Sequence, residues 1–167
     1  MYNRTFTRDE LEGIIKSCLQ KLRRLDKYLL DKKANERAIT HKLAKYLEDE
    51  IPEFDVDCEY NRFEQKDLDD MVKRLGLPRD NYNWDDIKTS PVIPDIIIHE
   101  RGPYGKNILV IEVKKSSSLI SEIFDRNKLI AFTIEPFNYE LGLFLKIDLD
   151  NEDDKMDWYS NGIRIFE

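Results

Sequence analysis

The chain has 167 residues, of which 41% are hydrophobic and 37% charged, and its formal net charge is −7. This length favours a single domain, and no apolar run approaches the roughly 18 residues that a membrane-spanning helix needs. Without an apolar signal stretch at the N-terminus or metal-ligand spacing of its two cysteines, the sequence predicts a cytoplasmic protein with reduced cysteines and no membrane partner.

The charges are distributed unevenly along the chain. Residues 1–45 carry twelve Lys/Arg against six Asp/Glu, a net of +6, whereas residues 46–167 carry fifteen against twenty-eight, a net of −13. Such asymmetry often marks a surface for nucleic acid or another partner on the basic side. An ordinary solvated helix face explains the basic residues equally well.

Two helices are predicted before the first strand. Thr7 and Glu10 form a capping-box pattern, and the apolar spacing that follows predicts one long amphipathic helix over residues 8–31. Asn35 is placed to cap a second helix over residues 36–50, which Pro52 ends. The basic face of the first helix carries Lys16, Lys21, Arg23, Arg24 and Lys27.

The rest of the chain reads as strands with one further helix. Strands are predicted over residues 54–60, 93–99, 107–114, 139–147 and 162–166, and a helix over 119–133 with Leu119, Ile123, Ile130 and Ala131 facing inward. Polar residues 61–92 read as an insertion with a short helix near 67–75, and residues 150–157 as an acidic loop. The order α-α-β-β-β-α-β-β predicts a mixed α/β domain.

The most informative residues lie on the two central strands. A strand period of two places Glu112 and Lys114 on one face, and a hairpin of the strands 93–99 and 107–114 would bring Asp95 near Glu112. Burying these charges costs several kcal/mol (about 3–5 when one partner is missing) unless they are paired or bound to metal. Mg²⁺ prefers oxygen ligands and commonly takes one or two carboxylates together with substrate phosphate oxygens. The sequence therefore predicts a Mg²⁺-dependent site for phosphodiester hydrolysis.

The pattern Glu36 on a helix, Pro94-Asp95, Glu112-Val113-Lys114 and a following helix resembles the PD-(D/E)xK nuclease superfamily. In more detail, the chain resembles the small uncharacterised bacterial members of this superfamily. The resemblance implies a restriction-endonuclease-like mixed sheet flanked by helices, with a core over 35–147, an N-terminal helical extension over 1–34 and a C-terminal strand region over 148–167. It also implies that Asp95 and Glu112 bind Mg²⁺, with Mn²⁺ as a substitute, that Glu36 is an additional ligand, and that Lys114 is catalytic.

Other polar residues are open to two interpretations. Asn61, Arg62 and Lys128 are candidate substrate contacts, yet the first two could simply finish a strand. Lys128 could pair only with Asp125, three residues earlier on the same helix. Glu36 could serve only the dipole of its helix, Asp95 a turn, and Glu112 with Lys114 a salt bridge at a strand end. His41 and His99 are expected to be solvated.

The leading interpretation is a Mg²⁺-dependent endonuclease that cleaves DNA, in phage defence, restriction or repair. The alternatives are a catalytically silent nuclease-fold protein that binds a protein partner, or an acidic mimic of nucleic acid. Because DNA binding favours a positive surface, the acidic body suggests that a partner protein or a homo-oligomer supplies part of the DNA affinity.

Overall fold

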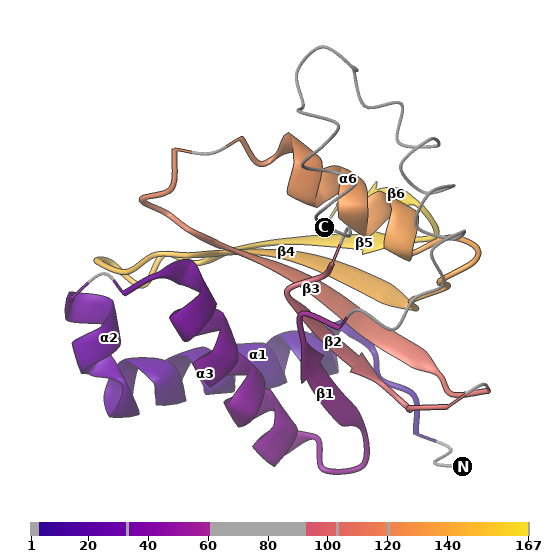
Figure 1. The fold of residues 1–167 in the computed structure, drawn as a ribbon, viewed down its shortest axis with the longest axis horizontal. Coiled ribbons are helices and arrows are strands. Elements are labelled where there is room, and N and C mark those ends of the chain that lie inside the picture. Colours follow the sequence, from indigo (N-terminus) through magenta and orange to yellow (C-terminus); the bar gives the residue numbers. More distant parts are fainter. Residues whose placement is uncertain (1–3, 33, 61–92, 103, 120, 167) are drawn as a thin grey trace.

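The computed structural model describes the whole chain except residues 1–3, 33, 61–92, 103, 120 and 167. Helices cover both faces of one mixed β-sheet (Figure 1). The helices are α1 (Arg8–Leu25), α2 (Lys27–Asp31), α3 (Glu36–Glu50) and α6 (Ile123–Phe132). The strands are β1 (Asp55–Cys58), β2 (Ile96–His99), β3 (Asn107–Lys115), β4 (Leu141–Ile147), β5 (Lys155–Ser160) and β6 (Ile163–Ile165). The predicted α/β class is confirmed.

The six strands lie in the sheet in chain order, β1 to β6. Among the described strands, β3 and β4 are the parallel pair, connected through α6, and the other neighbours are antiparallel. In the hairpin of β2 and β3, Ile96 lies opposite Ile111 and Ile97 opposite Val110. The predicted hairpin is therefore confirmed.

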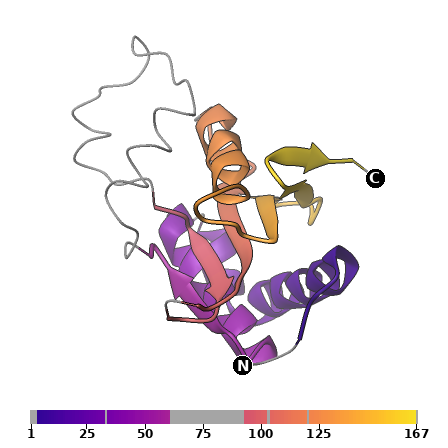
Figure 2. The same ribbon diagram turned by 90° about the vertical axis from the view of Figure 1, so that its right-hand side faces the viewer.

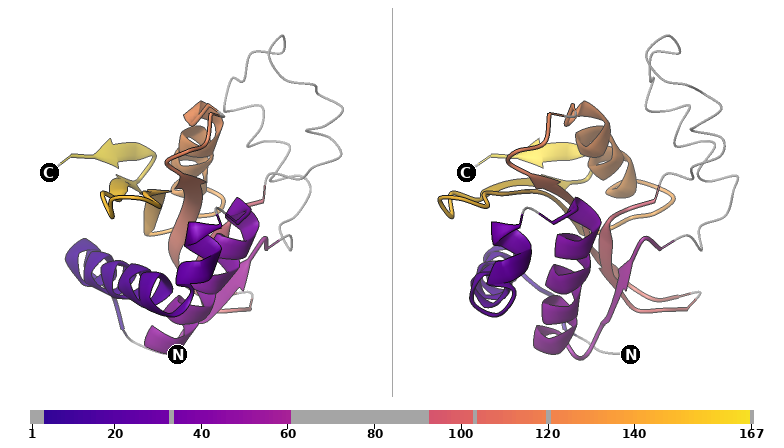
Figure 3. Two further views of the ribbon diagram at one scale, coloured as in Figure 1. Left: turned by 90° about the vertical axis from the view of Figure 1, so that its left-hand side faces the viewer. Right: turned by 60° about the vertical axis from the view of Figure 1, so that its left-hand side comes forward.

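Two apolar cores lie on opposite faces of the sheet. One lies against α1 and α3 and receives Ile111 and Val113 of β3, while the other lies against α6 and receives Val110. Figure 2 shows α6 on the opposite side of the sheet from α1 and α3. Figure 3 shows α1 and α3 packed beside each other. Because β3 is central and covered on both faces, its charged side chains are buried unless they lie near its end.

The N-terminal helix begins as predicted but ends earlier. Thr7 and Glu10 form the capping box, and the apolar stripe packs on the core. The single helix expected over residues 8–31 is wrong, because Asp26 separates α1 from α2. The Asp26 carboxylate accepts a hydrogen bond from Tyr46 and lies 3.3 Å from the amine of Lys42, both on α3. These contacts hold the break against the neighbouring helix.

Two further expectations are corrected. Part of the expected acidic loop belongs to β5, where Trp158 enters one core and Asp157 lies 2.7 Å from the guanidinium of Arg126. An acidic residue is tolerated in this strand because an arginine neutralises it. The helix α6 begins at residue 123 rather than 119, and Leu119 and Ile123 are exposed rather than inward-facing.

The two cysteines and the limited apolar length of the described helices agree with the sequence analysis. Cys18 is buried, Cys58 is half-buried, and both are free. Among the described residues, none of the helices has the length and apolar character needed to cross a bilayer. The predicted short helix over 67–75 lies outside the described residues.

Candidate active site

Asp95 and Glu112 meet where the β2–β3 hairpin is open. Asp95 directly precedes β2, and continuing the register of Ile96 opposite Ile111 places it beside Glu112. One carboxylate oxygen of Asp95 accepts a hydrogen bond of 2.8 Å from the backbone N–H of Val113. Burial raises the pKa of Asp95, although the charge of Lys128 and this hydrogen bond oppose the rise. The predicted convergence of the two residues is thus found.

Glu112 is the most deeply buried charged residue of the site, with 1% of its surface exposed. Its Oε2 lies 2.5 Å from Nζ of Lys128, whereas its Oε1 is buried and has no hydrogen-bond partner among the residues that the structure describes. Burial raises the pKa of Glu112 well above its ordinary value, the Lys128 charge opposes the rise and the Asp95 charge adds to it. A buried carboxylate oxygen without a partner is costly, and it is free to accept a cation.

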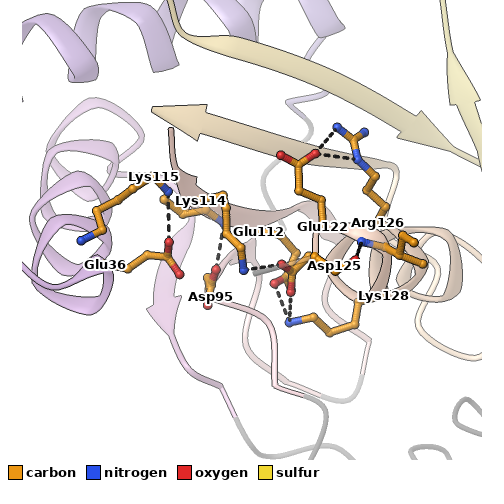
Figure 4. A network of polar contacts seen from close by, with 12 residues as sticks. Glu36, Asp95, Glu112, Lys114, Lys115, Glu122, Asp125, Arg126 and Lys128 are labelled. Atoms are coloured by element: carbon orange, nitrogen blue, oxygen red, sulfur yellow. Dashed lines mark hydrogen bonds and ion pairs between the residues drawn. The ribbon is translucent and has the colours of Figure 1, made fainter. Parts of the chain in front are cut away.

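Lys114 lies on the same sheet face as Glu112, as the strand period predicts. Its amine donates a hydrogen bond of 2.7 Å to Asp125 of α6 (Figure 4). Burial disfavours the charged amine, but the hydrogen bond to Asp125 and the charges of Glu36 and Asp95 outweigh burial, so the pKa of Lys114 is raised. Lys114 is therefore a cation among three carboxylates, held by α6.

Glu36 connects α3 to the end of β3. It lies in the first turn of α3, which Asn35 caps, and its Oε2 accepts a hydrogen bond of 3.0 Å from the backbone N–H of Lys115. Glu36 therefore lies at the edge of the site and also benefits from the helix dipole, whereas its role as a metal ligand stays a prediction. Within the described ranges, no group of three or more His, Cys, Asp or Glu side chains is arranged to hold a metal ion.

The helix α6 supplies two further charged residues, Asp125 and Lys128, which the sequence allows either to pair with each other or to face the site. Asp125 contacts Lys114 and also lies 3.7 Å from Nζ of Lys128. Lys128 is buried and faces Glu112 rather than solvent. The other two candidate substrate contacts, Asn61 and Arg62, lie outside the described residues.

A groove leads from the surface to the site between α3 and β1. Its volume is about 590 Å³, and its lining consists of Asn35, Glu36, Arg37, Thr40, His41, Cys58, Glu59 and Asp95. Arg37 and His41 are exposed at its flank, as expected for His41. Arg37 lies 2.5 Å from Glu59, which also lines the groove, so the approach to Asp95 and Glu36 carries charges of both signs.

His99 on strand β2 is not solvated, in contrast to the prediction. His99 is buried, with 4% of its surface exposed, and its Nε2 lies 2.9 Å from the Asp57 carboxylate. Asp57 is also hydrogen-bonded by Arg101, with 3.0 Å between Nε and Oδ2. The expectation of a solvated His99 is wrong because neighbouring β1 supplies an acidic partner that local sequence does not reveal.

The basic face of α1 is engaged with the protein's own carboxylates. Arg23 lies 2.7 Å from Asp154, Lys16 lies 2.6 Å from Glu12, and Lys21 is paired with Glu50. The apolar stripe of α1 packs on the core, as predicted, but these pairs leave the basic face largely neutralised. Lys16, Arg24 and Lys27 are the exposed members of the predicted set.

Comparison with known proteins adds no assignment. No family model matches the chain, and no curated protein or solved structure matches it either.

Proposed function

We propose that the chain is a metal-dependent nuclease of the PD-(D/E)xK type that hydrolyses phosphodiester bonds of DNA. The observation that carries the proposal is the pairing of the half-buried Asp95 with the buried Glu112 at the open end of the hairpin, with Lys114 on the same face. The order α3, β1, β2, β3, α6, β4 supports a restriction-endonuclease-like fold, since it follows the α-β-β-β-α-β core that the resemblance implies.

The donor set suits a small divalent cation. Asp95 and Glu112 offer two carboxylates, and the partnerless Oε1 of Glu112 is a buried acceptor. Mg²⁺ commonly takes one or two carboxylates and completes its octahedron with waters and substrate phosphates, so a site without a third ready-made ligand is adequate. When bound, the ion supplies positive charge at the phosphate and lowers the pKa of an attacking water.

The residues around this pair have separate roles in the proposal. Glu36 extends the acidic edge of the site toward the groove, where it lies beside Asp95 in the lining. Lys114 stabilises the negative charge that develops on the phosphate, and Asp125 holds its amine. Arg37 and His41 line the approach, where phosphates of the substrate backbone would lie.

A catalytically silent nuclease-fold protein that binds a partner protein is the second candidate. It is favoured by the pairing of both site lysines with carboxylates, Lys114 with Asp125 and Lys128 with Glu112. An ion-pair network of this kind can persist for structural reasons alone.

Cleavage assays separate the two candidates. The purified chain is incubated with supercoiled plasmid, linear duplex DNA, single-stranded DNA and RNA in Mg²⁺ or Mn²⁺, beside Lys114→Ala and Lys115→Ala. Lys115 is the matched control, since its amine contacts the carbonyl of Ala34 rather than the site carboxylates. Cleavage that Lys114→Ala abolishes and Lys115→Ala retains supports the nuclease. Equal residual cleavage by all three proteins, or none by the unmodified chain, rejects it.

A further inference from the structure

Lys128 is a buried lysine whose amine is surrounded by oxygen atoms. Its Nζ lies 2.5 Å from Oε2 of Glu112 and 3.7 Å from Oδ1 of Asp125, and it donates a hydrogen bond of 3.3 Å to the carbonyl of Ile93. Only 6% of the residue is exposed. Three oxygen atoms from α6, β3 and the segment before β2 therefore already form a cation-binding position, and the ammonium group fills it (Figure 4).

The charges around Lys128 do not cancel. Two ammonium groups, those of Lys114 and Lys128, face a larger set of carboxylates. These carboxylates are Glu36, Asp95, Glu112 and Asp125. With all groups ionised, four negative charges against two positive charges leave an excess of two, which is the charge of one divalent cation. In the described part of the chain, Oε1 of Glu112 is still without a hydrogen-bond partner.

We infer that Lys128 is an internal counter-cation that competes with a divalent metal ion for Glu112 and thereby sets the metal affinity of the site. The inference rests on the proposed function, since it takes Glu112 as a ligand. A divalent ion and an ammonium group repel each other strongly at ligand distances inside a protein. Lys128 must therefore leave Oε2 of Glu112 when the ion binds. It is a positioning residue that holds Glu112 in place until then.

The test is a calorimetric titration of the full chain with Mn²⁺ at pH 8, without nucleic acid, comparing the unmodified protein with Lys128→Met. Methionine retains much of the length of lysine and removes the competing charge. The variant should bind Mn²⁺ at least about tenfold more tightly, because a unit charge near the ion is worth that much or more in a partly buried site. Lys21→Met is the matched control, since it removes the same charge from an ion pair with Glu50 at the opposite end of α3 from Glu36.

The outcomes separate this inference from the proposed function. Tighter binding by Lys128→Met, or binding by that variant alone, supports the inference. Equal or weaker binding by Lys128→Met than by the unmodified protein overturns it and leaves the proposed metal site standing. If neither protein binds Mn²⁺, both the inference and the proposed metal site are rejected.

A second measurement on the unmodified chain applies if Lys128→Met fails to fold. In protein labelled with ¹³C at the lysine Cε, saturating Mg²⁺ should shift the signal of Lys128, assigned through Lys128→Arg, while the signal of Lys21 stays in place. An unchanged Lys128 signal at saturation would show that the ammonium keeps its position, and would overturn the inference.

Discussion

The amine of Lys114 on β3 lies 2.7 Å from the carboxylate of Asp125 on α6, so the lysine proposed to be catalytic is held by a residue of a different element. This contact makes Asp125 a positioning residue for Lys114. We expect Asp125→Asn to reduce kcat about 10-fold or more with a smaller change in KM, because positioned charge contributes a few kcal/mol to catalysis, about 3 for one donor. Asp9→Asn on the exposed start of α1 is the control. An unchanged kcat in Asp125→Asn would assign Asp125 to structure alone.

Two substitutions of Glu36 can distinguish a role in stability from a role in catalysis. Its hydrogen bond to the backbone N–H of Lys115 and its place at the helix start should stabilise the fold, so Glu36→Ala should lower the free energy of unfolding by about 1–2 kcal/mol. Glu36→Gln retains an acceptor oxygen and should cost less. If Glu36 is an additional ligand, Glu36→Gln should nevertheless reduce metal-dependent cleavage as strongly as Glu36→Ala. Urea unfolding and cleavage rates give the two quantities, and cleavage that follows stability would contradict the ligand role.

The Asp57 network predicts a pH dependence of stability. Burial raises the pKa of Asp57, but hydrogen bonds from Arg101 and His99 outweigh burial and place it below the ordinary value of 3.8. A carboxyl group with a lowered pKa in the folded state contributes stability above its ordinary pKa and loses that contribution as the pH falls through the lowered value. Asp57→Asn should therefore cost about 1–3 kcal/mol at pH 7, and the difference from the unmodified chain should shrink below pH 3.8.

Asp55→Asn provides the control for this experiment. Asp55 lies two residues earlier on β1 and also contacts Arg101, but its side chain is 38% exposed against 21% for Asp57. Its substitution should cost less at every pH. A stability difference for Asp57→Asn that stays constant from pH 7 to pH 2.5 would argue against the charged network.

The position of the basic residues predicts where nucleic acid binds. On α3, the exposed Arg37, His41 and Lys45 follow one another at helical spacing beside the groove. Arg37 already lies 2.5 Å from Glu59, so the test is Lys45→Glu. This charge reversal should weaken DNA binding and reduce the slope of log affinity against log salt by about 1, since each neutralised phosphate releases counterions. Fluorescence anisotropy between 50 and 300 mM salt, a range over which phosphate contacts lose about 10³-fold or more in affinity, measures both quantities.

The same titration on Lys16→Glu gives the comparison, because Lys16 already pairs with Glu12 on α1. Its substitution should change neither affinity nor slope appreciably. If Lys16→Glu weakened binding as much as the α3 reversal, the DNA would lie along α1, as the basic composition of the first 45 residues first suggested.

The site was predictable from the sequence where local geometry decides it. The strand period alone places Glu112 and Lys114 on one face, and a hairpin between two apolar runs brings Asp95 to them. The partners of these residues were not predictable, because they depend on how α6 lies across the sheet. Asp125 and Lys128 are three residues apart and look like a solvated pair, yet both face the sheet.

The fold shows the same division between local and tertiary information. Caps at Thr7 and Asn35 are local signals, and both helices begin where predicted. The break at Asp26 depends on Tyr46 of another helix, and the acidic start of β5 depends on Arg126 of α6. Such contacts between distant residues override the propensity that a sequence window records.

The burial of β3 on both faces has a consequence for how the site arises. A slip of this strand by one residue would turn Glu112 and Lys114 into the core against α1 and α3 and would turn Val113 toward α6. A slipped strand therefore cannot keep both apolar cores intact while displacing only the charged residues. The carboxylate pair and the lysine come together in the same cooperative step that closes both cores, so a chain that has folded has also assembled its candidate active site.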